Sequence, residues 1–114
     1  MRLVIVESPY AGDLEKNLKY ARECMHECIR RGEAPFASHL LYTQEGILDD
    51  NVPAQRKLGI EAGLAWGEKA DATIVYIDYG ISLGMKLGIE EAERIGRKVE
   101  YRTLYAPVYE NNKD

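Results

Sequence analysis

The segment at residues 8–13, Ser-Pro-Tyr-Ala-Gly-Asp, joins an apolar run to a helical pattern and carries hydroxyl, glycine and acidic groups. A turn with glycine lets the backbone approach a ligand closely. The helix start behind it offers free N–H groups and a partial positive charge, which suit a phosphate or a sugar hydroxyl. The same residues also fit an ordinary strand-to-helix turn in which Asp13 caps the helix and nothing binds. The segment alone leaves both interpretations open.

A second segment of this kind, Asp-Tyr-Gly-Ile-Ser-Leu-Gly at residues 78–84, follows another apolar run. Ser82 is predicted to cap a helix, either as an anion-ready start with Gly84 behind it or as a cap alone. His39 offers acid–base chemistry, although a lone histidine in a loop is more often a hydrogen-bonding or surface residue. Tyr10 and Tyr79 could stack on a base or cover the end of a sheet.

Alternating strand and helix patterns must position these groups. Apolar runs predict strands at 3–7, 34–37, 72–77 and 98–103. Helical spacing predicts helices at 13–31, 53–69 and 82–95, with a long loop at 38–52. Because parallel crossovers are right-handed, this alternation predicts an α/β fold: a flavodoxin-like three-layer sandwich with about four parallel strands in the order 2-1-3-4. The turns at 8–13 and 78–84 then flank one crevice at the carboxyl ends of the strands, and the long loop could cover it.

Each helix has apolar residues at helical spacing. Leu14, Leu18, Ala21, Met25 and Cys28 share one face of the first helix, and Leu58, Ala62, Ala65 and Trp66 form one stripe of the second. In the third helix Met85, Ile89 and Ala92 are expected to point inward. Cys24 and Cys28 are expected to be packed thiols, because their spacing predicts neither a disulfide framework nor a metal site.

The composition narrows the class of protein. With 114 residues the chain is predicted to form one domain at 1–104 and a C-terminal tail at 105–114. A net charge of -4 argues against nucleic acid as the partner, and the chain lacks the run of about 20 apolar residues that a membrane span needs. The free thiols and the missing signal-peptide pattern favour a cytoplasmic location. Neither a metal nor a cofactor is expected.

Four features of the sequence are characteristic in combination: the turn at 8–13, the helix with Asn17, Tyr20 and Ala21, the Ala-Asp-Ala stretch at 70–72, and the Gly-Ile-Ser-x-Gly-Met turn at 80–85. Together they resemble the nucleoside 2-deoxyribosyltransferase superfamily. The similarity extends to Thr103 and is greatest to small uncharacterised phage and bacterial members. It implies a flavodoxin-like sheet, a dimer or larger assembly, and a nucleoside or nucleotide in the crevice. The candidate ligand-facing residues are then Ser8, Pro9, Tyr10, Gly12, Asp13, Asn17, Ser38, His39, Tyr42, Asp78, Ser82, Gly84, Met85 and Lys86.

The chain departs from this superfamily at the reacting residue. Active members use a carboxylate nucleophile in a Gly-x-x-Glu-Leu-Gly stretch, and here Lys86 stands in its place. An ammonium group cannot form the glycosyl ester that a carboxylate forms, and Glu90 and Glu91 lie one turn further on. No catalytic residue is therefore assigned.

The favoured hypothesis is a phage- or bacterium-type protein that binds, and sequesters, a nucleotide or nucleotide-derived signalling metabolite without turnover. One alternative is an N-glycosidase or deoxyribosyltransferase that acts through a displaced acid such as Asp78 or Glu91. Another is a non-catalytic interaction module with a vestigial crevice.

Assembly is suggested by Trp66, which lies beside the small residues Ala62, Gly63 and Ala65. A large aromatic side chain on an exposed helix is a common interface anchor, so a homodimer or larger homo-oligomer is expected. The alternative is that Trp66 packs on the sheet of its own subunit.

Overall fold

The computed structural model describes residues 1–105 and contains one parallel sheet. Its strands are β1 (Arg2–Glu7), β2 (Glu33–Phe36), β3 (Ala72–Tyr76) and β4 (Lys98–Arg102). The helices are α1 (Leu14–Arg30), α2 (Pro53–Gly67) and α3 (Leu83–Arg94), with a short 3-10 helix, η1 (Ser38–Leu40). The strand order β2-β1-β3-β4 confirms the predicted flavodoxin-like order. Apart from Tyr105, the predicted tail lies outside the described residues.

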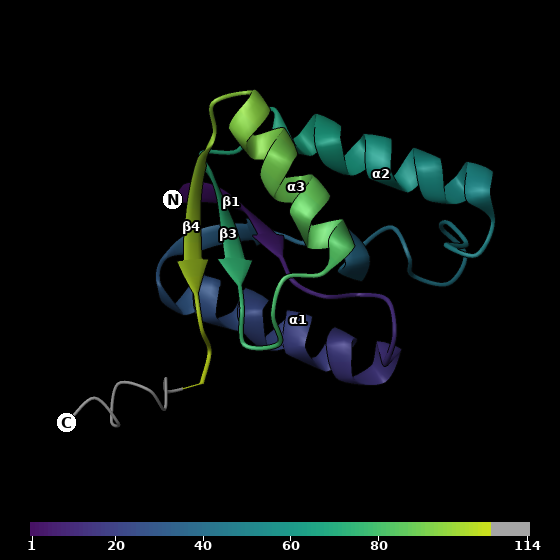
Figure 1. The fold of residues 1–114 in the computed structure, drawn as a ribbon, viewed down its shortest axis with the longest axis horizontal. Coiled ribbons are helices and arrows are strands. Elements are labelled where there is room, and N and C mark those ends of the chain that lie inside the picture. Colours follow the sequence, from purple (N-terminus) through teal and green to yellow (C-terminus); the bar gives the residue numbers. More distant parts are fainter. Residues whose placement is uncertain (106–114) are drawn as a thin grey trace.

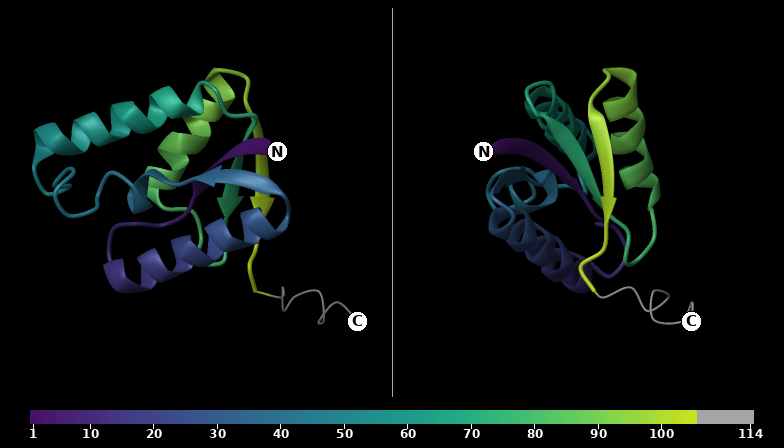
Figure 2. Two further views of the ribbon diagram at one scale, coloured as in Figure 1. Left: turned by 180° about the vertical axis from the view of Figure 1, so that it is seen from behind. Right: turned by 90° about the vertical axis from the view of Figure 1, so that its left-hand side faces the viewer.

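The helices form layers on both faces of the sheet, as the two views of Figure 2 show, with α1 on one side and α3 on the other. In Figure 1, α2 lies next to α3 and extends past the strands. Side chains alternate along each strand, so Val4, Val6 and Ile74 pack toward α1 against Tyr20 and Cys24. On the opposite face Val75 packs against Met85 and Ile89 of α3, as predicted for that helix.

The inward face of α1 differs from the prediction at its start. Leu14 is 47% exposed, because it belongs to the first turn of the helix, ahead of the residues that pack on the sheet. Ala21 and Cys28 are buried, as predicted, and Asn17, Tyr20 and Cys24 are buried as well. The two cysteines are free and buried, as expected.

The apolar stripe predicted along α2 is not the face by which this helix packs on the rest of the fold, apart from one contact of Trp66. Leu58 is 56% exposed and Trp66 is 58% exposed, although the Trp66 ring also stacks on Phe36 of β2 with 5.5 Å between ring centroids. The inward positions are held by glycines. A Cβ on Gly59 would lie 3.3 Å from Leu48, one on Gly63 would lie 3.4 Å from Ser38, and one on Gly67 would lie 3.2 Å from the Arg97 guanidinium. The absence of side chains at these glycines lets α2 lie close to η1 and to Arg97, while Leu58, Ile60 and Leu64 are exposed.

Within residues 1–105, no helix has the length and apolar character that crossing a membrane requires.

Candidate functional site

The turn after β1 is held in one conformation by its own side chains. The Asn17 amide donates hydrogen bonds to the carbonyls of Tyr10 and Ala11, both 3.0 Å long. Asp13 caps α1 by accepting from the Lys16 amide at 3.2 Å. Gly12 has a φ of +102°, which side chains rarely allow. The turn is therefore pre-formed, and Asn17 and Asp13 brace it.

Ser8, the first residue of this turn, carries a polar group that the rest of the fold leaves unused. Its side chain is 1% exposed, and among the described residues no group forms a hydrogen bond with its hydroxyl oxygen. Burying an unpaired hydroxyl costs on the order of 1–3 kcal/mol. Unpaired groups of this kind are rare in folded proteins and are typical of places where a ligand or water completes the bonding.

Tyr10 and His39 bring the turn and η1 together. Their rings stack, with 4.8 Å between centroids and an angle of 17° between planes. Burial lowers the pKa of His39, while the Ser8 backbone and Asp50 act in the opposite direction. Near pH 7 the imidazole is therefore mostly uncharged and can both donate and accept a hydrogen bond. The Thr43 hydroxyl donates to the His39 carbonyl, which ties the following loop to η1.

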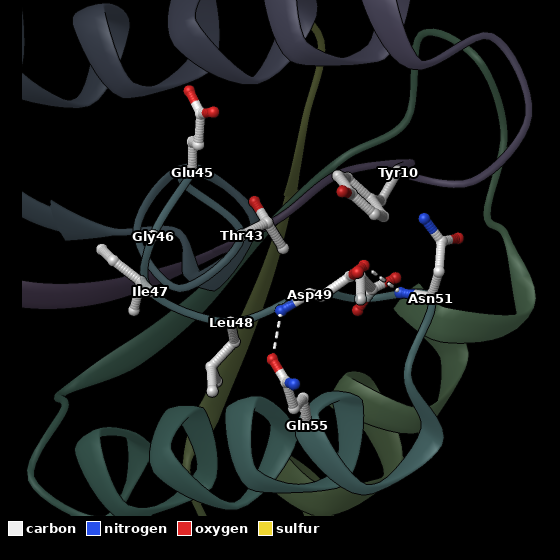
Figure 3. Close-up of a pocket in the computed structure, with 10 residues that line it drawn as sticks. Tyr10, Thr43, Glu45, Gly46, Ile47, Leu48, Asp49, Asn51 and Gln55 are labelled. Atoms are coloured by element: carbon white, nitrogen blue, oxygen red, sulfur yellow. Dashed lines mark hydrogen bonds between the residues drawn. The ribbon is translucent and has the colours of Figure 1, made fainter.

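Tyr10, one member of this stacked pair, lines a pocket of about 500 Å³ (Figure 3). Tyr10 reaches it from the first turn, Gln55 from α2, and the remaining lining residues come from the loop after η1: Thr43, Glu45, Gly46, Ile47, Leu48, Asp49, Asp50 and Asn51. The Gln55 side chain accepts a hydrogen bond from the Asp49 amide at 2.7 Å, so α2 supports the loop. Three carboxylates and two side-chain amides, those of Asn51 and Gln55, make the lining rich in acceptors, which suits a ligand with hydroxyl or amino donors.

The residues predicted at the start of α3 form a different part of the structure. Ser82 caps the helix and accepts from the Met85 amide at 3.3 Å, as predicted. Met85 is buried in the core, and Gly84 and Lys86 are exposed. None of these four residues lines the pocket beside Tyr10.

The carboxylate of Asp78 forms hydrogen bonds on the face of the sheet that α1 covers. It accepts hydrogen bonds from the Tyr20 hydroxyl and from the amides of Leu104 and Tyr105, at 2.9 and 3.1 Å for the amides. Burial would raise the pKa of Asp78, but these bonds outweigh it and lower the pKa. The ring of Tyr79 also lies on this side, 4.5 Å from that of Tyr20. Asp78 thus joins β3, α1 and the end of β4.

Of the predicted site residues, the structure brings together Ser8, Tyr10 and His39, with Ser38 beside them against α2. Pro9 is buried in the same turn. Tyr42 lies by Phe36 and Gly59 rather than in the pocket lining. Sequence reasoning missed the pocket side chains of Thr43, Asp49 and Gln55, for which the only signal was the unusual length of the loop.

Glu7 was also missed, because it reads as the polar end of an apolar strand. Its carboxyl lies over α3 at Gly88, where an added Cβ would be 2.1 Å from one carboxyl oxygen. Burial raises the pKa of Glu7 to about 8, with the charge of Arg97 opposing the shift. At neutral pH this carboxyl group is therefore protonated in most molecules.

The chain belongs to the family described as "Domain of unknown function (DUF7768)", which matches residues 2–102. No curated protein matches it. Among solved structures, the chain is similar to a 2-deoxyribosyltransferase from the psychrotolerant bacterium Bacillus psychrosaccharolyticus, with a TM-score of 0.72 and 16% sequence identity. The match covers 92% of this chain and 74% of that chain. At this identity the likeness shows a shared α/β fold.

Proposed function

We propose that the protein binds a nucleoside-class small molecule in the pocket beside Tyr10, with the base stacked on or near the Tyr10–His39 pair. The observation that carries the proposal is Tyr10, which stacks on His39 and lines a pocket of about 500 Å³, with the unpaired Ser8 hydroxyl in the same turn. The volume is within the range of small-molecule sites. Aromatic rings bind bases by stacking, and the surrounding carboxylates and side-chain amides can accept hydrogen bonds from sugar hydroxyls or amino groups.

The similar solved structure supports this class of ligand, since that protein is a 2-deoxyribosyltransferase described as a biocatalyst for the synthesis of nucleosides. In open α/β sheets, ligands bind beyond the carboxyl ends of the strands, which is where the turn after β1 and η1 lie.

The expected form of this function is binding without turnover, including sequestration of a nucleotide or nucleotide-derived signal. The acidic lining bears on that choice. Glu45, Asp49 and Asp50 repel an anionic phosphate inside the pocket, so a nucleotide would have to direct its phosphate outward. Uncharged nucleosides are therefore expected to bind more tightly than their 5′-monophosphates.

Cleavage of a glycosidic bond is the second candidate, and it is favoured by the position of the Glu7 carboxyl, which lies at the end of β1 against Gly88 of α3. A carboxyl group that keeps its proton near neutral pH is the usual general acid of glycoside chemistry. The two acids first considered for this role are held elsewhere, Asp78 by Tyr20 and two backbone amides and Glu91 by Arg94.

Calorimetry with the four 2′-deoxynucleosides and their 5′-monophosphates tests the proposal, followed by chromatography of the incubated ligand. We expect binding with the ligand recovered intact, and release of free base would identify a glycosidase instead. Tyr10→Ala should weaken binding about tenfold or more, because stacking contributes roughly 1–3 kcal/mol per base. Tyr101→Ala, which removes an exposed tyrosine on β4, is the matched control. Lack of binding by every probe would contradict the proposal.

A further inference from the structure

The carboxyl of Glu7 is an acid that the fold itself does not use. Glu7 ends β1 and directly precedes Ser8, so it lies at the carboxyl edge of the sheet. Strand alternation directs it to the face that α3 covers, opposite to Val4 and Val6. Within residues 1–105, its carboxyl takes part in neither an ion pair nor a hydrogen bond. A structural carboxylate would be expected to have such partners, as Glu33 and Asp78 have.

The neighbouring helix makes room for this carboxyl. A Cβ at Gly88 would lie 2.1 Å from one carboxyl oxygen, 2.9 Å from the other and 2.5 Å from the carboxyl carbon. Any side chain at position 88 would therefore displace the acid. A glycine inside a helix costs about 1 kcal/mol relative to alanine, so α3 gives up helix stability where Glu7 lies against it.

The charged side chains around Glu7 do not neutralise a negative charge on its carboxyl group. The cation that acts on it is Arg97, but this guanidinium donates to the Thr73 hydroxyl at 2.9 Å and to the Gly67 carbonyl at 2.5 Å. On α3, Glu91 is held by Arg94 at 2.6 Å, and Lys86 and Glu90 are exposed. The β3 residue in register with Glu7 is Val75, which is uncharged.

We propose that Glu7 is a ligand-binding residue of the crevice, whose carboxyl donates a hydrogen bond to an acceptor atom of the bound molecule and accepts one from the donor beside it. This inference rests on the proposed function, because it assigns a contact to the same nucleoside-class ligand. Glu7 is not among the residues that line the pocket beside Tyr10, so the base would have to extend from Tyr10 across the end of β1 to reach this carboxyl. An O–H donor next to a C=O acceptor matches the edge of a base that carries a ring-nitrogen acceptor beside an amino donor, as adenine and cytosine do. Ser8, the next residue, supplies the second unused polar group at this edge.

The proposal can be tested by varying the pH, because it requires the proton on the Glu7 carboxyl. A ligand that needs protonated Glu7 must bind more weakly as the group ionises. With a pKa of about 8, the affinity of the wild-type protein should fall about tenfold between pH 7 and pH 9. Deoxyadenosine and deoxycytidine are the probes, because neither base titrates in this range.

Calorimetry is carried out across this pH range on the wild type, on Glu7→Gln and on Glu93→Gln. Glutamine keeps a donor and an acceptor but does not titrate, so Glu7→Gln should bind with an affinity independent of pH. Glu93→Gln removes one exposed negative charge from α3 and should retain the wild-type profile. A Glu7→Gln variant whose affinity falls with pH as the wild type does would overturn the proposal. Absence of binding by the wild type at every pH would instead contradict the proposed function.

A measurement on the unaltered chain covers the case in which Glu7→Gln does not fold. The side-chain carboxyl carbon of Glu7 is followed by carbon-13 NMR during a pH titration, with and without deoxyadenosine at saturation. If the ligand uses the proton, binding must raise the titration midpoint of Glu7, because the protonated form binds better. A midpoint that the ligand leaves in place would overturn the proposal.

Discussion

Arg102 holds the carboxylate of Glu33 with two parallel contacts, Nη1 to Oε1 at 2.9 Å and Nη2 to Oε2 at 2.6 Å. The two residues lie at opposite edges of the sheet, at the start of β2 and the end of β4. Arg2 of β1 adds a third contact to the same carboxylate, also at 2.6 Å. The ion pair thus joins the two edge strands across the α1 side, and bidentate geometry of this type is the strong form of a charged hydrogen bond.

Glu33→Gln should destabilise the protein at neutral pH and much less in acid. The bonds from Arg102 lower the pKa of Glu33 to about 2 from its ordinary 4.5. A lowered pKa gives stability that is present above pH 4.5 and lost as pH falls toward 2. We expect a loss of roughly 2 kcal/mol at pH 7, measured by urea unfolding. Glu93→Gln, an exposed acid, serves as control. A loss that stayed constant between pH 7 and pH 3 would contradict the assignment.

The effect of Glu7→Gln on the free energy of unfolding should depend on pH in the opposite direction. Burial raises the pKa of Glu7 from 4.5 to about 8, so the folded state holds a proton that the unfolded state releases. Stability from this group is full below pH 4.5 and declines as pH rises toward 8. The variant should therefore gain stability relative to the wild type by roughly 2 kcal/mol at pH 9, while the two proteins converge near pH 4. Thermal melts across that range provide the measurement, and parallel curves would refute this account of Glu7.

Lys86→Glu tests whether the start of α3 belongs to the ligand site. Lys86 is exposed, so a phosphate directed out of the acidic pocket toward α3 would meet a positive charge there. Reversing the charge should weaken 5′-monophosphates severalfold and leave deoxynucleosides unchanged. Calorimetry at low salt gives both values. Equal effects on the two ligand classes, or no effect on either, would separate α3 from the site.

The outer face of α2 is the basis for a prediction about assembly. Ile60 and Leu64 are 51% and 40% exposed on a helix whose inner glycines already contact its own subunit, and a helix apolar on both sides is typical of one covered by another surface. We propose a symmetric homodimer through this face. Light scattering at micromolar concentration should give twice the monomer mass, and Leu64→Glu should halve it. Leu83→Glu, an equivalent change at an exposed α3 residue, should not. A monomer mass for the wild type would contradict the proposal.

The fold was predictable because each local signal agreed with the sheet. Apolar runs of strand length, Asp13 and Ser82 as caps, and Gly32 and Gly96 after two helices placed every strand and α-helix to within a few residues. The inward face of α2 was not predictable from hydrophobicity. Here the residues that pack are glycines, which carry no apolar side chain, while Leu58, Ile60 and Leu64 beside them in sequence are exposed.

For the candidate site, the sequence predicted only those residues whose role depends on their near neighbours in the chain. Asp13 and Ser82 cap helices through bonds to residues three positions ahead, and the sequence contains that information. The stacking of Tyr10 on His39 joins residues 29 positions apart, and the Glu7 carboxyl meets a helix 81 positions away. Such pairings depend on strand order and on which side chain is missing at the contact, so they emerge only once the chain is folded.

The glycine spacing of α2 has a consequence for the order in which the molecule opens. A glycine within a helix makes the helical state less stable by about 1 kcal/mol relative to alanine, and α2 contains Gly59, Gly63 and Gly67. Gly67 is also the only residue of α2 that is buried. Little within the segment holds it helical once it leaves η1 and Arg97. In a monomeric variant such as Leu64→Glu, the backbone amides of α2 should therefore exchange with deuterium well before those of α1, and a protease should cut within α2 before it cuts α1. Either event would detach Gln55 and the loop that lines the pocket.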